Sequence, residues 1–143
     1  MTKSIFRKTL SANDVGSTGG HQGGVLIPKS ETELLAFLPP LDAGIKNPNT
    51  WLDCIDENSV LQRFKFRYYN NKLHDEGGTR NEYRVTYMTA WLRNVGAKEG
   101  DIFEISGTQG EQEYYVKVIP AAVNEVQSDV PVRIKLRGWN RVH

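Results

Sequence analysis

Residues Leu10 to Pro28 read LSANDVGSTGGHQGGVLIP, and a long polar segment precedes the first apolar run of this stretch. Glycine is the commonest residue in it, and glycine lets a backbone approach a partner closely or take a positive φ. The other polar residues carry short donors and acceptors, the types that read base edges or bind phosphate. They are Ser11, Asn13, Asp14, Ser17, Thr18, His21 and Gln22. Composition alone fits either a functional loop or a flexible N-terminal linker.

A second stretch, Tyr68 to Tyr87, reads YYNNKLHDEGGTRNEYRVTY. Together the two stretches resemble the N-terminal effector-binding domain of the EcoRII-type restriction endonucleases. The matching residues are Leu10–Asp14, Gly16, Thr18–Gln22 and Ile27–Pro28 in the first stretch, and Tyr68–Asn70, Thr79–Glu82, Arg84 and Thr86 in the second. Their order and spacing are kept over about half of the chain, which makes the signal far more specific than a lone glycine motif.

The resemblance implies a mainly β fold, a B3-like DNA-binding pseudobarrel related to plant B3 transcription-factor domains. It implies one B3-like domain over residues 1–143, with an N-arm at about residues 8–24 and a C-arm at about residues 69–84. The two arms would grip the major groove of double-stranded DNA and read CCWGG or a related site, one arm on each half.

The resemblance also implies the larger protein to which such a domain belongs. The chain would be the non-catalytic effector domain of a type II restriction endonuclease, within a restriction–modification system in a prokaryotic cytoplasm. We expect a covalently linked nuclease domain outside these residues, and Mg²⁺ only in that domain. No cofactor is expected in this chain.

Candidate DNA contacts follow residue by residue from the same match. They are Lys8, Ser11, Asn13, Asp14, His21 and Gln22 in the N-arm, and Lys72, Arg80, Asn81, Glu82 and Arg84 in the C-arm. Arg80 can donate two parallel hydrogen bonds to guanine O6 and N7. Asp14 or Glu82 can accept from cytosine N4 or fix a neighbouring arginine, and His21 can donate to guanine or to phosphate.

Several of these positions have a second interpretation. Glu82 fits a plain salt bridge to Arg80 or Arg84 as well as it fits a base contact, and Arg84 fits a solvated strand charge. Lys72 stands where the family is expected to have arginine, and lysine lacks the planar fork needed for bidentate reading. The C-arm is also longer than expected by about the pair Asp75–Glu76, whose carboxylates must point away from phosphate.

Length and composition set the class of protein. The chain has 143 residues and a mean hydropathy of −0.51, enough for one compact domain with a modest core. No apolar run approaches 18 residues, so no membrane span is expected, and the first residues lack the apolar region of a signal peptide. The single Cys54 fits a reducing cytoplasm and a small buried side chain in a strand.

The net charge of +1 hides a strong pattern along the chain. Net charge is +3 over residues 1–30, −5 over 31–59, +5 over 60–98, −6 over 99–129 and +4 over 130–143. Both matched stretches lie in positive blocks. This pattern is typical of a protein that turns one positive face to a polyanion, although chance runs of solvated charge also produce it.

Periodicity predicts about seven short strands and two short helices. Strands are expected to end at Ile5–Phe6 and to cover 25–28, 51–56, 60–69, 82–87, 101–106, 113–119 and 130–136, with a hairpin turn at 107–110. One helix should follow Ser30 as N-cap, with Glu33 completing a capping box, and the other should cover 89–94 and end near Gly96. The polar edge of strand 60–69 carries Lys65, where we expect a phosphate contact.

The sequence offers no catalytic centre. No lysine has an acidic residue two positions before it, so the Asp/Glu-x-Lys nuclease signature is absent, and so is His-x-Lys. One cysteine and three dispersed histidines give no zinc spacing. A triad of Ser11, His21 and Asp14 in one loop would lack an oxyanion hole.

Two other functions stay open at this point. A stand-alone transcription regulator of the same fold would have a gene that ends near His143. A small enzyme or ligand-binding β-barrel that uses the glycine-rich loop would show no salt-sensitive DNA binding.

Overall fold

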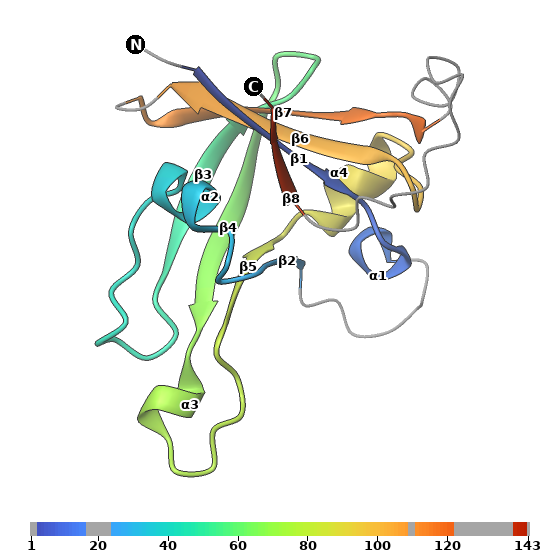
Figure 1. Ribbon diagram of the computed structural model, residues 1–143. Helices are drawn as coiled ribbons and strands as arrows, with labels where there is room; N and C mark the ends of the chain where they lie inside the picture. Colours follow the sequence, from blue (N-terminus) through green and yellow to red (C-terminus); the bar gives the residue numbers. More distant parts are fainter. Residues whose placement is uncertain (1–2, 17–23, 109–110, 122–138, 143) are drawn as a thin grey trace.

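The computed structural model describes residues 3–16, 24–108, 111–121 and 139–142, whose strands form one eight-stranded sheet (Figure 1). The strands are β1 (Lys3–Thr9), β2 (Val25–Ile27), β3 (Asn49–Ile55), β4 (Leu61–Tyr69), β5 (Glu82–Thr86), β6 (Ile102–Thr108), β7 (Glu113–Ile119) and β8 (Trp139–Val142). Their order across the sheet is β2-β5-β4-β3-β7-β6-β1-β8.

The sheet curls so that its two edge strands, β2 and β8, meet. Every neighbouring pair is antiparallel except β3 and β7, which run parallel. The seam between the edge strands is bridged by the indole of Trp139, whose Nε1 donates to the carbonyl oxygen of Leu26 at 3.0 Å. This is the mainly β pseudobarrel that the sequence predicts, with one strand more than the expected seven.

The core follows from the alternation of apolar residues along the strands. In the β3–β4 pair, Leu52 lies opposite Phe64, and both are 1% exposed. Phe66 follows Phe64 on the same side of β4, because alternate residues of a strand face the same way. Each buried side chain of this size stabilises the fold by about 1.5–3 kcal/mol. Phe64, Phe66 and Tyr68 thus form the core-facing side of β4.

Two of the four helices in the described ranges were predicted. These are α2 (Thr32–Phe37) and α4 (Thr89–Asn94), and Trp91 and Leu92 of α4 are buried as expected. Gly96 follows α4 with φ 72, which suits a glycine. The capping box predicted at Ser30 is wrong: the N-cap of α2 is Glu31, and no side chain caps it.

The other two helices, α1 (Ala12–Val15) and α3 (Asn71–His74), lie in the two arms and were not predicted. Each has four residues, too few to show a helical period. The β8 strand was not predicted either, because its four residues are too few to show a clear alternation. The strand expected at 130–136 and part of the turn expected at 107–110 lie outside the described residues.

Cys54 is fully buried in β3, as its place in an alternating strand predicts. Burial, together with the neighbouring carboxylate of Asp53, raises the pKa of the Cys54 thiol to about 12. Such a thiol stays protonated and does not act as a nucleophile near neutral pH. None of the helices in the described ranges is long and apolar enough to cross a membrane.

Candidate nucleic-acid interface

The C-arm is the end of the β4–β5 ribbon, which projects from the barrel and carries α3 at its tip (Figure 1). In the register of the ribbon, Tyr69 lies opposite Glu82, and Arg67 lies opposite Arg84. These four residues share one face of the ribbon, because the alternating residue Tyr68 is buried on the other. The strand period therefore gathers arginine, glutamate and tyrosine side chains on the outer face.

The tip of the C-arm is closed by its own backbone. The Arg80 amide donates to Asn71 Oδ1 at 2.8 Å, and the Lys72 amide donates to the Arg80 carbonyl at 3.0 Å. Between them Gly78 passes so close that a Cβ there would lie 2.2 Å from the Asn71 carbonyl oxygen. Only glycine fits this turn, so Gly78 fixes where Arg80 leaves the tip.

The base of the C-arm is fastened to the loop between α2 and β3 through Asn70, which is 0% exposed. Its Oδ1 accepts from the backbone amide of Asn47 at 2.7 Å, and its own backbone amide donates to Asn47 Oδ1 at 3.1 Å. Its Nδ2 donates to the carbonyls of Ile45 at 2.9 Å and Ala43 at 3.3 Å. All the hydrogen-bonding groups of the Asn70 side chain are thereby used, which makes this loop a brace for the arm.

Two further contacts tie the same brace to α3. His74 Nε2 lies 2.9 Å from the Ala43 carbonyl oxygen, and Lys46 Nζ lies 2.6 Å from Asp75 Oδ2. The Asp75 carboxylate is therefore paired with a cation of the bracing loop. This ion pair neutralises the first carboxylate of the acidic pair Asp75–Glu76 in the longer C-arm.

Three predicted contact residues form one ionic cluster on the outer face of the ribbon. Glu82 accepts from Arg80 Nε at 3.1 Å and from Arg84 Nε at 2.6 Å. Burial alone would raise the pKa of the Glu82 carboxyl, but the hydrogen bonds and charges of Arg84 and Arg80 outweigh it and leave the pKa below its usual value. Of the two interpretations of Glu82, the salt bridge is present, and it fixes both arginines.

Arg80 is held on a second side by an aromatic ring. Its guanidinium lies 3.8 Å from the centroid of the Tyr69 ring, a stacking distance. Asn81, the next residue, accepts a short hydrogen bond from the Tyr68 hydroxyl. Tyr68 in turn stacks on Tyr83 with ring centroids 4.2 Å apart. These contacts make the Arg80–Glu82 segment rigid before any partner binds.

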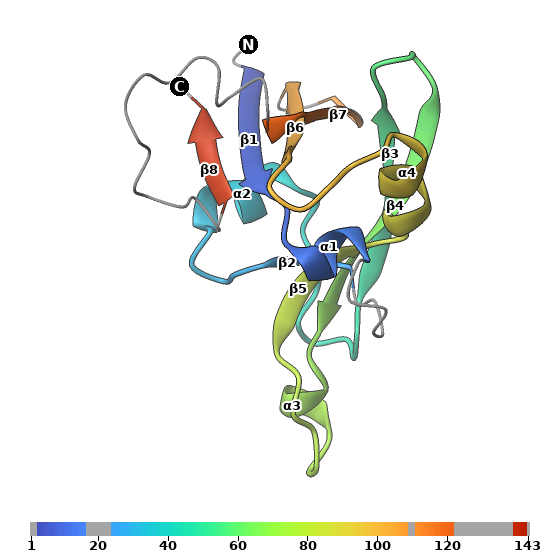
Figure 2. The same cartoon turned by 90° about the vertical axis from the view of Figure 1, so that its right-hand side faces the viewer.

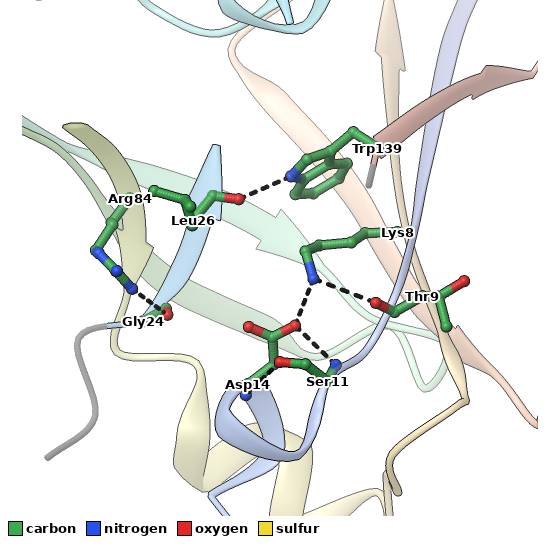
Figure 3. A network of polar contacts seen from close by, with 8 residues as sticks. All are labelled: Lys8, Thr9, Ser11, Asp14, Gly24, Leu26, Arg84 and Trp139. Atoms are coloured by element: carbon green, nitrogen blue, oxygen red, sulfur yellow. Dashed lines mark hydrogen bonds and ion pairs between the residues drawn. The ribbon is translucent and has the colours of Figure 1, made fainter. Parts of the chain in front are cut away.

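The N-arm begins with α1, which is fixed to the barrel by a buried ion pair (Figure 3). Lys8 Nζ lies 2.6 Å from Asp14 Oδ2, and both residues are less than 10% exposed. Ser11 and Asp14 also form a capping box, in which Ser11 Oγ accepts from the Asp14 amide and the Asp14 carboxylate accepts from the Ser11 amide. These bonds engage the Ser11 and Asp14 side chains at the start of the helix.

Arg84 joins the two arms. Besides its bond to Glu82, its Nη1 donates to the Gly24 carbonyl at 3.0 Å, where the N-arm enters β2 (Figure 3). Gly24 has φ 84, and a Cβ there would lie 2.3 Å from the Val85 carbonyl oxygen. Arg84 is thus more than a solvated strand charge, because its hydrogen bond connects the end of the N-arm to the C-arm.

The remaining predicted residues are placed as follows. Asn13 is exposed on α1, and Lys72 is exposed on α3. Lys65 lies on β4 with its Nζ 4.7 Å from the centroid of the Trp51 ring. His21 and Gln22 lie outside the described residues. Sequence reasoning missed the roles of Tyr69 and Asn70, although the matched motif Tyr68–Asn70 contains both.

No group of three or more metal-ligating side chains occurs among residues 3–16, 24–108, 111–121 and 139–142. The clustered side chains of the arms are instead arginines held by one carboxylate. Such a set recognises an anionic or hydrogen-bonding surface.

Comparison with known proteins identifies the family. The model of the family described as "Restriction endonuclease EcoRII, N-terminal" matches residues 1–103, which include both arms. The chain belongs to this family. The type II restriction enzyme EcoRII of Escherichia coli is 38% identical over 111 residues, which are 72% of this chain and 24% of that enzyme. The chain therefore spans about a quarter of the length of this curated relative.

Solved structures agree on the fold. The B3 domain of the UbaLAI restriction endonuclease, crystallised with cognate DNA, has a TM-score of 0.64 at 18% identity, covering 97% of this chain and 86% of that one. The Arabidopsis FUS3–DNA complex has a TM-score of 0.57 at 20% identity, covering 82% and 98%. The EcoRII-type N-terminal domain described here is thus a B3-like pseudobarrel.

Proposed function

We propose that this chain binds a specific double-stranded DNA site through both arms in the major groove, as the non-catalytic effector domain of a type II restriction endonuclease. The observation that carries the proposal is the Arg80–Glu82–Arg84 cluster on the outer face of the C-arm. The family membership and the B3 fold, shared with two proteins solved with DNA, support it.

Arg80 is the residue best prepared to read a base. Its Nε is bonded to Glu82 and its plane is stacked on Tyr69, so the guanidinium is held in one orientation. The two terminal nitrogens then present parallel donors, which match O6 and N7 of guanine. A site such as CCWGG offers guanines in both halves, and Arg80 would read one of them.

The N-arm would read the other half. Its first turn, α1, is rigid and presents Asn13 to solvent, while Lys8 and Asp14 are engaged with each other. In this proposal Ser11 and Asn13 supply polar contacts, and His21 and Gln22 follow in the same arm. The bond from Arg84 to Gly24 holds the two arms at a fixed spacing for one duplex.

The rest of the enzyme would be a linked nuclease domain that holds Mg²⁺. EcoRII of Escherichia coli is about four times as long as the matched region, and the sequence in hand carries no Asp/Glu-x-Lys or His-x-Lys. We expect the purified chain to leave cognate DNA intact in the presence of Mg²⁺ or Mn²⁺. Site-specific cleavage by the chain alone would disprove the non-catalytic role.

Selection of bound duplexes from a random pool tests the function directly. We expect one short motif to be enriched, with G·C pairs in both halves. Affinity should fall by about a thousandfold between 50 and 200 mM salt if roughly six phosphates are neutralised. No enriched motif, or a flat salt response, would refute specific binding.

Variants separate base reading from phosphate contact. Arg80→Ala should cost about 1–3 kcal/mol on the selected duplex and relax the preference at one G·C pair. Lys65→Ala should weaken selected and random duplexes alike and reduce the salt slope by about one. Equal loss on both duplexes in Arg80→Ala would make Arg80 a phosphate clamp.

A further inference from the structure

A row of exposed aromatic and cationic side chains runs along the outer face of β3 and β4, beyond the predicted arm residues. Trp51 and Tyr87 are 44% and 59% exposed and stack with ring centroids 5.4 Å apart. Arg63 and Lys65 lie 5.2 and 4.7 Å from the centroid of Trp51, and Arg67 lies 5.8 Å from that of Tyr87. Large aromatic rings gathered with cations on an open strand face indicate an interaction surface.

Next to this row the surface is hollowed. The hollow, here called the β4–β5 hollow, has a volume of about 440 Å³ and is lined by Arg67, Tyr69, Thr86, Tyr87, Thr89 and Ala90. Tyr69 belongs to both the hollow and the C-arm, because Arg80 stacks on its ring. The hollow therefore begins where the Arg80 site ends.

Arg67 is the charged group of the hollow, and its hydrogen bonding is incomplete. Its Nε is shielded from solvent and has no partner in the described part of the chain. Its Nη2 reaches only the Tyr87 hydroxyl, at 3.5 Å, the outer limit for a hydrogen bond. The Arg67 guanidinium lines the hollow, so an acceptor bound there would give its terminal nitrogens a better partner than the Tyr87 hydroxyl.

The backbone at Tyr87 adds an independent sign of function. Tyr87 has φ 65, a strained conformation for a bulky residue, and such conformations cluster at binding sites. This conformation turns the chain from β5 into α4 and leaves the Tyr87 ring on the outer face, at the rim of the hollow.

We propose that the β4–β5 hollow binds a backbone phosphate of the duplex held by the arms. This inference rests on the proposed function and assigns a second contact region to it. A guanidinium suits phosphate, and the hydroxyls of Tyr69 and Tyr87 can donate to its other oxygens. Arg67 precedes Tyr69 by two residues along β4, a step of about 7 Å, so a duplex gripped at Arg80 passes over the hollow.

The charge of the face favours phosphate over a protein segment. Of the three cations on β4, Arg63 is paired with Asp53 at 3.0 Å, and no described carboxylate lies within ion-pair distance of Lys65 or Arg67. Arg63, Lys65 and Arg67 are alternate residues of β4, so their cations are evenly spaced along the strand. Phosphates are also evenly spaced along a nucleic-acid backbone.

The test combines a charge-removing variant with DNA that lacks single charges. Arg67→Met keeps an unbranched side chain of similar reach, and Lys117→Met is the matched control, because β7 lies at the end of the barrel opposite α3 (Figure 1). Both are titrated with the duplex recovered by selection, with a random duplex, and with duplexes in which one phosphate at a time is an uncharged methylphosphonate. Arg67→Lys, which keeps the charge, is measured beside them.

We expect Arg67→Met to weaken selected and random duplexes by the same factor, on the order of tenfold, and to reduce the salt slope by about one. One methylphosphonate that weakens the wild-type complex should have no effect on Arg67→Met, and Arg67→Lys should keep the wild-type salt slope. If the wild type binds its selected duplex but Arg67→Met behaves like Lys117→Met, the inference is wrong. If the wild type selects no duplex, the proposed function itself fails.

Discussion

Glu82 is the residue on which the C-arm cluster depends, since its two oxygens hold two different arginines. An arginine without such a partner would bind any phosphate within reach, whereas a fixed and neutralised arginine is available mainly to a base edge. In the proposed function the carboxylate would limit non-specific affinity and aim the donors of Arg80. The pairing of Glu82 with Arg80 and Arg84 would affect both DNA binding and stability, so one variant of Glu82 tests both effects.

Glu82→Gln should lose about 1 kcal/mol of stability at neutral pH, because one partly buried carboxylate no longer binds two cations. The folded-state pKa of Glu82 is lowered, so its contribution is full above the usual glutamate pKa of about 4.3 and is lost as pH falls through the lower folded value. The difference in unfolding free energy between wild type and variant should therefore shrink on acidification. Urea unfolding across this pH range measures it.

Glu82→Gln should bind random duplexes more tightly than the wild type does, and the selected duplex less tightly. The ratio of its affinities for selected and random duplexes should therefore fall. Glu113→Gln, on exposed β7, makes the same charge change far from the arms and serves as control. An equal response of both variants would show that only net charge matters.

At the scale of elements, the C-arm is a long ribbon that could not hold its position by its own pairing. A two-stranded ribbon is marginally stable in water, and the tip residues of α3 bury nothing. The bracing loop, residues 42–48, supplies the missing contacts through Asn70, His74 and the Lys46–Asp75 pair. A rigid arm loses less freedom on binding, so under the proposed function the brace would add to affinity without a contact to DNA.

Asn70→Ala should destabilise the protein by about 2–4 kcal/mol, because it removes the three hydrogen bonds of a fully buried side chain and leaves backbone groups of the brace unpaired. Amide exchange at residues 71–81 should quicken more than elsewhere. The exposed Asn58→Ala is the matched control and should stay within about 0.5 kcal/mol. Uniform exchange rates along the chain in Asn70→Ala would contradict the bracing role.

At the scale of the whole molecule, the arms meet because the barrel closes. The N-arm ends at edge strand β2, which pairs with β5 on one side and meets β8 at the seam on the other. Trp139 closes that seam through its bond to Leu26 and packs its ring edge-to-face on Phe103, 5.9 Å between centroids. Figure 2 shows β8 beside β1 and away from α3. The closure therefore acts on the N-arm, which ends at β2, and not on the tip of the C-arm.

Trp139→Phe should keep the aromatic packing but lose the indole donor, at a cost of about 1–2 kcal/mol. The amides of β2 should exchange faster, and the discrimination between selected and random duplexes should fall as the N-arm loosens. Trp51→Phe, at an exposed ring, should cost less stability and leave β2 unchanged. Hydrogen exchange and duplex titration of both variants give the comparison.

The sequence by itself determined the fold class, most strands and the location of the arms. Alternation over residues 51–56 and 60–69 predicted which side chains face the core, because a strand period of two is a local property. The matched motifs located the cluster of Arg80, Glu82 and Arg84, since these residues lie on one strand at a spacing of two. Membership of the EcoRII-type family was also visible in the motifs alone.

Only the tertiary structure decided which of these residues touch. The pairing of Lys8 with Asp14, the bond from Arg84 to Gly24 and the brace around Asn70 join segments whose contacts depend on how the chain turns back on itself. The helices α1 and α3 are too short to have a period, and β8 is placed by its pairing with β1. The sequence lists the donors and acceptors, but the closure of the barrel sets their distances, and a hydrogen bond depends on distance.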